Sequence, residues 1–575
     1  MLDFRNKPKT RKPAGDFSDR RKFLVIFMMT CMVVLIGRAV DLQVLNKQFL
    51  KAQGNRRHVD EVSVSAYRGM IKDRNGEPLA ISSPVQSIWV NPQELKLAGK
   101  ARIKQMEKLL DLQPGKISSL LNENSHKQFA YVARRLNPGF ADQVKALKLK
   151  GVYFEREFKR YYPAGGVSAH LVGFTNVDDI GQEGLESGFE KLLKGIRGSK
   201  RIIRDGQRQI IADVENIKEP VAGKNLELSI DQRIQYLAYR ELQLAVSANK
   251  AKSAALIVLD AKNGEILAAV NQPSFNPNTR KGLKENLYRN RAITDVFEPG
   301  STIKPFVVAA ALDGGYVRPG EVFETHGIYR VGHHLVKDVH NYGSLDLMGV
   351  LKKSSNVAVS QMALKMPPKY FWNVYHRLGF GMAAGSGFPG EASGSLLDYQ
   401  RWHDFERATL SFGYGLSTSV LQLARAYTAL ADDGLLHSVS LLKRDEDIDA
   451  QRVFSAKTAR SVRAMLENVI MKDGTAYEAR VDGYRVAGKT GTVKKAGAGG
   501  YTGKNYFAVF AGMAPADKPR VIIVVMIDEP SAGQYYGGLV SAPVFSKVMA
   551  GALRVLDIAP DQESTMPILL TRQDP

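Results

Sequence analysis

Three short motifs, far apart in the chain, contain side chains that together could carry out acyl transfer. They are Ser301-Thr302-Ile303-Lys304, Ser354-Ser355-Asn356 and Lys489-Thr490-Gly491-Thr492. A serine becomes an effective nucleophile when a base lies within hydrogen-bonding reach of its hydroxyl. Three-residue spacing on a helix places Ser301 and Lys304 on one face, so the first motif predicts a nucleophile with its base.

The second motif supplies polar groups that need no charge. Ser354 offers a hydroxyl that can pass a proton to a leaving amine, and Asn356 can hold a substrate amide by donating and accepting at once. Lys304 can serve as a base near neutral pH because burial and a nearby cation lower the pKa of a lysine. The residues leave open whether Lys304, or Ser354 together with Lys489, accepts the proton of Ser301.

The third motif is typical of a site that binds a terminal carboxylate. Lys489 supplies a cation, and the hydroxyls of Thr490 and Thr492 supply hydrogen-bond donors. Gly491 is expected to leave room for an acyl chain beside a strand edge. The backbone N–H of Thr492 is expected to complete an oxyanion hole with that of Ser301.

The Ser-x-x-Lys spacing alone has little specificity. It also occurs at Ser247 to Lys250 and at Ser440 to Lys443, which are predicted surface positions. Ser301 differs because the breaker residues Glu298-Pro299-Gly300 precede it, an apolar helix follows it, and the two other motifs come later in the chain in a known order.

The elements that must position these motifs are predicted from hydrophobic patterning. Asn263-Gly264 between the apolar runs 254–260 and 265–270 indicates a hairpin, and 506–513 and 521–527 are further strands. Residues 302–312, 360–364, 421–431 and 544–556 have helical patterns. We therefore expect an α+β fold in which helices cover an antiparallel sheet.

The N-terminal residues indicate a membrane anchor. Residues 23–37 form an uncharged apolar run, and Arg38 can reach the far interface if the span continues to about residue 45. A cleaved signal peptide is the alternative, but no small-x-small cleavage site follows the run. The basic flank at 1–22 predicts a cytoplasmic N-terminus and places the rest of the chain outside.

Charge and composition exclude several other classes. The net charge is +22, but residues 1–22 hold +5 of it and the remainder is spread along the chain. Such diffuse charge suits work beside anionic lipid or an acidic polymer as well as it suits nucleic acid, and we do not expect a nucleic-acid partner. Cys31 is the only cysteine, so no intrachain disulfide can form. His333, His334 and His340 lack a metal-site pattern, and we expect no metal and no cofactor.

Beyond the three motifs, several longer strings resemble the class B penicillin-binding proteins, and the division-specific members of proteobacteria most closely. The resemblance covers nearly the whole chain. It includes RGMIKDRNG at 68–76, RYYPAG at 160–165, AHLVGFTN at 169–176, RNRAITDVFEPGSTIKP at 289–305, SFGYG at 411–415 and YYGGLVSAPVF at 535–545.

The resemblance implies a penicillin-binding, serine acyl-transferase fold preceded by an elongated, mostly β pedestal. A polar stretch at 216–225 is the candidate linker between them. The expected domains are a cytoplasmic tail (1–22), a transmembrane anchor (23–45), a pedestal of the dimerisation type (46–220), a transpeptidase domain (225–560) and a polar tail (561–575). Asp73, Arg74 and Glu186, in pedestal motifs, are expected to make structural ion pairs.

Carried over from the family, Ser301 would be the acylated nucleophile, Lys304 its base, and Ser354 and Asn356 the second motif. Residues 489–492 would bind substrate, and Tyr414, Tyr535 and Tyr536 would line the rim for substrate or β-lactam. The resemblance implies cross-linking of peptidoglycan stem peptides during septum formation, inhibition by β-lactams, and partners that include an FtsW-type glycan polymerase and other divisome proteins. No glycosyltransferase-like segment is recognised, so glycan polymerisation is not expected.

Three other functions remain open from the residues. A β-lactamase would need efficient hydrolysis, usually with a glutamate in an E-x-x-L-N setting, which the sequence lacks. A D,D-carboxypeptidase would use the same three motifs with water as acceptor. A non-enzymatic scaffold or sensor fits poorly with an intact nucleophile, base and oxyanion donors.

Overall fold

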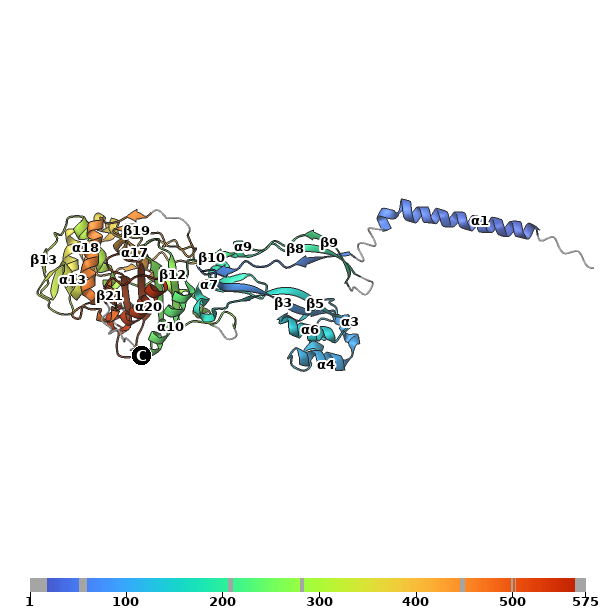
Figure 1. Ribbon diagram of the computed structural model, residues 1–575, viewed down its shortest axis with the longest axis horizontal. Coiled ribbons are helices and arrows are strands. Elements are labelled where there is room, and N and C mark those ends of the chain that lie inside the picture. Colours follow the sequence, from blue (N-terminus) through green and yellow to red (C-terminus); the bar gives the residue numbers. More distant parts are fainter. Residues whose placement is uncertain are drawn as a thin grey trace, which may run out of the picture. The chain divides into compact units, whose positions relative to one another are not determined.

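The computed structural model describes residues 18–50, 59–204, 210–279, 284–444, 450–497, 500–501 and 503–563. The chain forms two compact units, which are residues 1–66 with 196–221 and residues 67–195 with 222–575 (Figure 1). Most of the expected basic tail at 1–22 and of the polar tail at 561–575 lies outside the described residues.

The first unit begins with a long apolar helix. Helix α1 (Ser18–Val40) continues into η1 (Asp41–Leu45), and together they are long and apolar enough to cross a membrane. Arg38 donates to the carboxylate of Asp41 at 2.5 Å. The charge that interrupts the apolar pattern is therefore paired close to the end of the span.

Three antiparallel strands complete the first unit. Strand β1 (Val59–Val64) pairs with β8 (Gly198–Arg204), which pairs with β9 (Ile210–Lys218). The expected linker at 216–225 is more ordered than its composition indicates, because residues 216–218 end β9 and Val221 forms a bridge with Ile196. Backbone pairing outweighs the polar composition there.

The second unit contains two larger sheets. The first has the order β10-β2-β3-β4, with β5 also paired to β3. Its strands are β2 (Ile71–Lys72), β3 (Pro78–Val90), β4 (Ala130–Leu136), β5 (Val152–Tyr161) and β10 (Leu226–Glu227). Ile88 and Val90 of β3 share a separate hydrophobic core with α4 (Lys100–Leu109), α5 (Lys116–Glu123) and α6 (Pro138–Ala146).

The second sheet is antiparallel and has the order β12-β11-β23-β22-β21. It consists of β11 (Ser253–Asp260), β12 (Ile266–Gln272), β21 (Ala487–Lys494), β22 (Tyr506–Ala514) and β23 (Val521–Asp528). The hairpin at Asn263-Gly264 is confirmed, and Gly264 has the positive φ of 69° that such a turn requires. Every residue of β11 and β23 is buried, so both faces of the sheet need cover.

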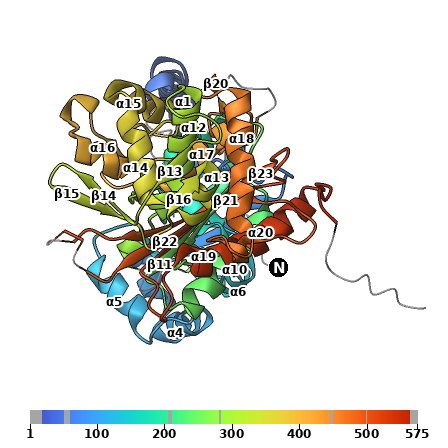
Figure 2. The same ribbon diagram turned by 90° about the vertical axis from the view of Figure 1, so that its left-hand side faces the viewer.

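Helices supply this cover on both faces (Figure 2). Helices α10 (Gln232–Ala248) and α20 (Ala542–Val555) pack together on one face, and α12 (Lys304–Asp313), α17 (Val420–Ala431) and α18 (Ala456–Glu467) lie on the other. The helical patterns at 421–431 and 544–556 are therefore confirmed. The pattern at 302–312 begins differently, because a 3-10 turn, η5 (Gly300–Ile303), precedes α12.

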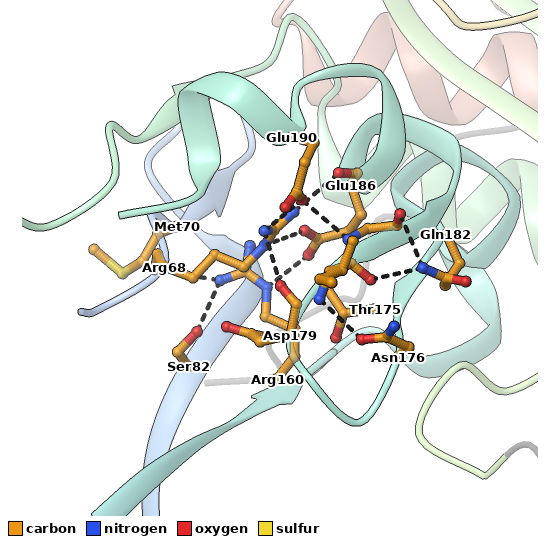
Figure 3. A network of polar contacts seen from close by, with 12 residues as sticks. Arg68, Met70, Ser82, Arg160, Thr175, Asn176, Asp179, Gln182, Glu186 and Glu190 are labelled. Atoms are coloured by element: carbon orange, nitrogen blue, oxygen red, sulfur yellow. Dashed lines mark hydrogen bonds and ion pairs between the residues drawn. The ribbon is translucent and has the colours of Figure 1, made fainter. Parts of the chain in front are cut away.

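A buried ion-pair network joins separate segments of the second unit (Figure 3). The carboxylate of Glu186 accepts from Arg68 at 2.7 Å and from Arg160 at 2.6 Å, and Arg68 also pairs with Glu190 at 2.7 Å. The side chains of Arg68, Arg160 and Glu186 are at most 1% exposed. The expected structural role of Glu186 is confirmed, as is an ion pair between Arg74 and Glu265 at 3.2 Å.

Removing the shared carboxylate should destabilise this unit strongly. We expect Glu186→Ala to lower the free energy of unfolding by about 3–5 kcal/mol, because two buried guanidinium groups lose their counter-ion. Urea unfolding of the full-length chain in detergent measures the change. The matched control is Glu321→Ala, which breaks a partly exposed ion pair with Lys365 and should cost less than about 1 kcal/mol. Equal losses in the two variants would contradict a special role for the network.

Candidate functional site

Ser301 lies in the 3-10 turn η5, directly before α12. Gly300 precedes it with a φ of 55°, a conformation that favours glycine. The carbonyl oxygen of Thr302 accepts from the hydroxyl of Tyr427 at 2.8 Å, and the Thr302 hydroxyl donates to the carbonyl oxygen of Pro299 at 2.6 Å. The turn is therefore held from both sides, and Ser301 itself stays partly exposed.

Lys304 begins α12 and is completely buried. Its Nζ donates to the carbonyl oxygen of Ser354 at 2.5 Å, to Ser354 Oγ at 3.1 Å and to Asn356 Oδ1 at 2.7 Å. These three acceptors match the three hydrogens of an ammonium group, so the charged form has none left for Ser301 Oγ. Loss of one proton would free a lone pair that can accept the proton of Ser301.

Ser354 lies between two lysines. Its Oγ accepts from Lys304 Nζ at 3.1 Å and from Lys489 Nζ at 2.9 Å. A hydroxyl has two acceptor positions and one hydrogen, so this arrangement leaves the Ser354 hydrogen free to donate. Ser354 also has a left-handed backbone, with φ 60° and ψ 43°, which is strained for a residue other than glycine. It ends α13 (Leu347–Lys353) in a conformation fixed by its surroundings.

Burial lowers the pKa of both lysines, and the charge of Lys489 adds to the effect at Lys304. Burial, with a smaller contribution from the charge of Lys489, holds the pKa of Lys304 well below its ordinary value, and the carboxylate of Asp338 partly opposes this. Burial lowers the pKa of Lys489 to about 7. Near neutral pH, one of these amines can therefore serve as a base beside Ser354.

The third motif lies on β21, the edge strand of the second sheet. Thr492 Oγ1 accepts from the backbone N–H of Gly537 at 3.1 Å, which leaves its own hydrogen available to a ligand. A Cβ on Gly491 would lie 3.0 Å from Thr302 Cγ2 and 3.1 Å from the Pro299 carbonyl oxygen. A side chain there would require these neighbours to shift by a few tenths of an ångström, so glycine suits the close approach of the strand to the nucleophile turn, whereas the sequence interpretation assigned that space to an acyl chain.

The hydroxyl of Thr490 donates to that of Thr475 at 3.1 Å. Thr475 lies in none of the three motifs, and sequence reasoning missed it. The contact ties the third motif to the segment that follows α18. Thr490 is therefore anchored on one side of the strand.

The three tyrosines proposed for the rim take different places. Tyr414 accepts from the backbone N–H of Lys494, at the end of β21, at 3.2 Å and packs edge-to-face on Tyr501. Tyr535 stacks on Tyr536, with ring centroids 4.5 Å apart, directly before the glycine that contacts Thr492. Tyr414 therefore lies at the end of the strand that carries the third motif, and Tyr535 and Tyr536 directly precede the glycine that contacts Thr492.

Asp338 is the most informative residue that sequence reasoning missed. It follows β15 (His334–Lys337), and its carboxylate accepts from the backbone N–H groups of Asn356 and Val357 and from the Ser355 hydroxyl. No spacing rule links it to the second motif. Only the hairpin of β14 (Ile328–Val331) with β15 brings it there.

The other Ser-x-x-Lys sites and the histidines fit ordinary structure. Ser247 is exposed on α10, as expected, whereas Ser440 is partly buried and donates to the carbonyl oxygen of Leu442. His334 stacks on Phe405, with ring centroids 4.1 Å apart. Within the described part of the chain, no group of three or more His, Cys, Asp or Glu side chains is placed to hold a metal ion.

Two family models match the chain. Residues 254–550 match the penicillin binding protein transpeptidase domain, and residues 63–228 match the penicillin-binding protein dimerisation domain. The first match contains all three motifs, and the second contains the buried network of Figure 3.

Individual relatives are similar along nearly their full length. The chain is 44% identical to the peptidoglycan D,D-transpeptidase FtsI of Escherichia coli, over 97% of this chain and 96% of that one. It is 43% identical to the probable peptidoglycan D,D-transpeptidase PenA of Neisseria meningitidis, with the same coverage. A crystal structure described as a peptidoglycan glycosyltransferase from Burkholderia ambifaria is similar with a TM-score of 0.53 and 43% identity, over 58% of this chain and 99% of that one.

The buried state of Lys489 predicts a pH-dependent stability. Its pKa is about 7 in the folded chain, against the ordinary value of 10.5 expected after unfolding. Between these values only the unfolded chain holds the proton, so stability rises with pH by up to about 1.4 kcal/mol per unit, and the gain is lost as pH falls toward 7. Below pH 7 both states are protonated and this contribution is constant.

Lys489→Met should remove this part of the rise. Urea unfolding of both proteins at pH 6, 7.5 and 9 measures it, because the stability of the wild type minus that of the variant should increase from pH 6 to pH 9. A difference that does not change with pH would contradict the lowered pKa.

Proposed function

The chain belongs to the class B penicillin-binding proteins, and from this membership we infer that it is a peptidoglycan D,D-transpeptidase that works through an acyl-enzyme on Ser301. The observation that carries the site assignment is the position of Ser354 Oγ between Lys304 and Lys489. A proton can move among these groups without any charged group entering from solvent.

Acylation uses the nucleophile turn and the second motif. Ser301 Oγ attacks the carbonyl carbon of the penultimate D-alanine of a stem peptide, and its proton passes to neutral Lys304, or to Lys489 by way of Ser354. The C–N bond to the terminal D-alanine then breaks. The free hydrogen of Ser354 goes to the leaving amine and is replaced from a lysine ammonium, which balances the protons.

Substrate binding uses the third motif and the rim. Lys489 and Thr492 bind the terminal carboxylate, Thr490 holds this end of the motif through Thr475, and Gly491 lets β21 lie against the nucleophile turn. The backbone N–H groups of Ser301 and Thr492 form the oxyanion hole. Tyr414, Tyr535 and Tyr536 line the rim, where a β-lactam ring occupies the place of the scissile amide.

The second half of the reaction forms the cross-link. An amine of a second stem peptide attacks the acyl-enzyme carbonyl and gives one proton to the deprotonated base. The bond between the carbonyl carbon and Ser301 Oγ then breaks, and the base returns that proton to Ser301 Oγ. Water in place of this amine would make the protein a carboxypeptidase or a β-lactamase. The family membership favours the amine as acceptor.

We place this activity at the division septum, on the outer side of the inner membrane. The apolar helix is a single-pass anchor, and the basic residues before it favour a cytoplasmic N-terminus and a periplasmic catalytic domain. The proposed partners are an FtsW-type glycan polymerase and other divisome proteins, and no nucleic acid. The proposed domains are the anchor at 23–45, the pedestal at 46–220 and the transpeptidase domain at 225–560.

Covalent labelling tests the nucleophile. We expect a penicillin to add one adduct to the full-length chain in detergent, with the adduct on Ser301 in a peptide map, and Ser301→Ala to lose it completely because the acyl bond forms to Ser301 Oγ. Intact-mass spectrometry measures both. Ser247→Ala is the matched control, and it should label like the wild type.

The fate of the label separates the other activities. A stable adduct and cross-linked product on addition of an amine acceptor support the transpeptidase. Labelling of Ser301→Ala at another serine would overturn the site, and rapid loss of the drug without an adduct would point to a β-lactamase.

A further inference from the structure

We propose that Asp338 is a positioning residue for acylation: it fixes the start of α14 (Asn356–Lys365) so that Asn356 holds Lys304 in place. The inference rests on the proposed acylation of Ser301 and adds to it a residue outside the three motifs. Asp338 directly follows β15, and its backbone N–H donates to the carbonyl oxygen of Gly327 at 3.0 Å. The hairpin therefore sets the place of its side chain.

The carboxylate of Asp338 occupies the N-terminus of α14. Oδ1 accepts from the backbone N–H of Asn356 at 2.5 Å and from that of Val357 at 3.0 Å, and Oδ2 accepts from Ser355 Oγ at 2.6 Å. The first N–H groups of a helix have no partner within the helix, and the helix dipole favours a negative charge there. Ser355 already caps this helix through Ala358, so Asp338 satisfies the remaining first-turn groups.

Lys337, the residue before Asp338, orients the side-chain amide of Asn356. The Nδ2 of Asn356 donates to the carbonyl oxygen of Lys337 at 3.0 Å, so Asn356 Oδ1 must face the other way, toward Lys304 Nζ at 2.7 Å. Residues 337 and 338 thus hold both the backbone and the side chain of Asn356. A shift at the start of α14 would move one of the three acceptors of Lys304, and errors of about 1 Å in such a site can cost about a hundredfold in rate.

Asp338 also acts on Lys304 through its charge. The charged groups that face Lys304 are Lys489 from β21 and Asp338 from the end of β15, and they have opposite effects on its pKa. The Asp338 carboxylate also contributes, after burial, to a raised pKa of Tyr342. Because the Asp338 carboxylate raises the pKa of Lys304, its removal should make the neutral, basic form available at a lower pH.

A residue that only caps a helix would affect folding alone. Asp231 provides the matched case, because its carboxylate accepts from the backbone N–H of Arg233 at 3.0 Å and caps α10. Neither this helix nor the two side chains that also contact Asp231, those of Arg233 and Asn75, belongs to any of the three motifs. Loss of either cap should lower stability by a similar amount. Only loss of Asp338 should change the rate and the pH profile of acylation per folded molecule.

The experiment compares Asp338→Ala, Asp338→Asn and Asp231→Ala in the full-length chain in detergent. The readout is the second-order rate constant for acylation by a penicillin from pH 5 to pH 9, divided by the folded fraction from urea unfolding. Asp338→Asn keeps an oxygen for the helix N–H groups and removes the charge, whereas Asp338→Ala removes both.

We expect Asp338→Ala to acylate about 10- to 100-fold more slowly than the wild type. Asp338→Asn should keep most of the rate, and the acid limb of its profile should move to lower pH. Asp231→Ala should match the wild type in both respects. If Asp338→Ala does not fold, the position of the acid limb in the pH profile of Asp338→Asn provides the test.

An unmoved acid limb in Asp338→Asn would overturn the role of the charge. A rate for Asp338→Ala equal to that of Asp231→Ala, per folded molecule, would overturn the positioning role. Failure of the wild type to be acylated on Ser301 would instead refute the proposed function, so the two failures are distinguishable.

Discussion

Two lysine side chains are buried against the hydroxyl group of Ser354, and the packing around the site in the second unit depends on that contact. Lys304 and Lys489 are both fully buried, and both donate to Ser354 Oγ. Burial of an ammonium group costs several kcal/mol even after relaxation, and a second charge of the same sign adds to the cost. The lowered pKa values reduce it, since at least one amine can lose its proton near neutral pH. Burial and the neighbouring like charge, which oppose folding of the site, also make a neutral, basic amine available there.

Such a site requires three distant segments to approach closely, and small residues permit it. Gly491 allows β21 to pass against Pro299 and Thr302, as a Cβ there would meet both. Gly413, in the segment SFGYG, lies so close to Gly300 that a Cβ would come within 2.5 Å of its backbone. The segment at 411–415 carries none of the three motifs, yet its backbone accepts from Gly300 at 3.1 Å and supports the nucleophile turn. Close packing explains the glycines of these segments.

The stabilisation that supports this site comes from elsewhere in the unit. Strands β11 and β23 are buried throughout, and helices cover both faces of their sheet. The network of Arg68, Arg160 and Glu186 is buried as well, and its carboxylate joins segments that lie far apart in the sequence. Ser354 keeps a left-handed backbone without being glycine, which persists only where neighbouring contacts determine it. A rigid frame therefore holds the strained and partly charged groups at the site.

The sequence by itself determined the motifs, the apolar span, the hairpin at Asn263-Gly264 and the later strands, because spacing, hydrophobic alternation and turn chemistry are local properties. The long matching strings also determined the family. Other features depended on tertiary structure. The sequence paired Lys304 with Ser301, but the folded chain directs its three hydrogen bonds to Ser354 and Asn356. It gave no sign of Asp338, whose place depends on a hairpin that contacts the start of a helix 18 residues later. Local patterns report which elements form, whereas the direction of a side chain between elements is decided only when they pack.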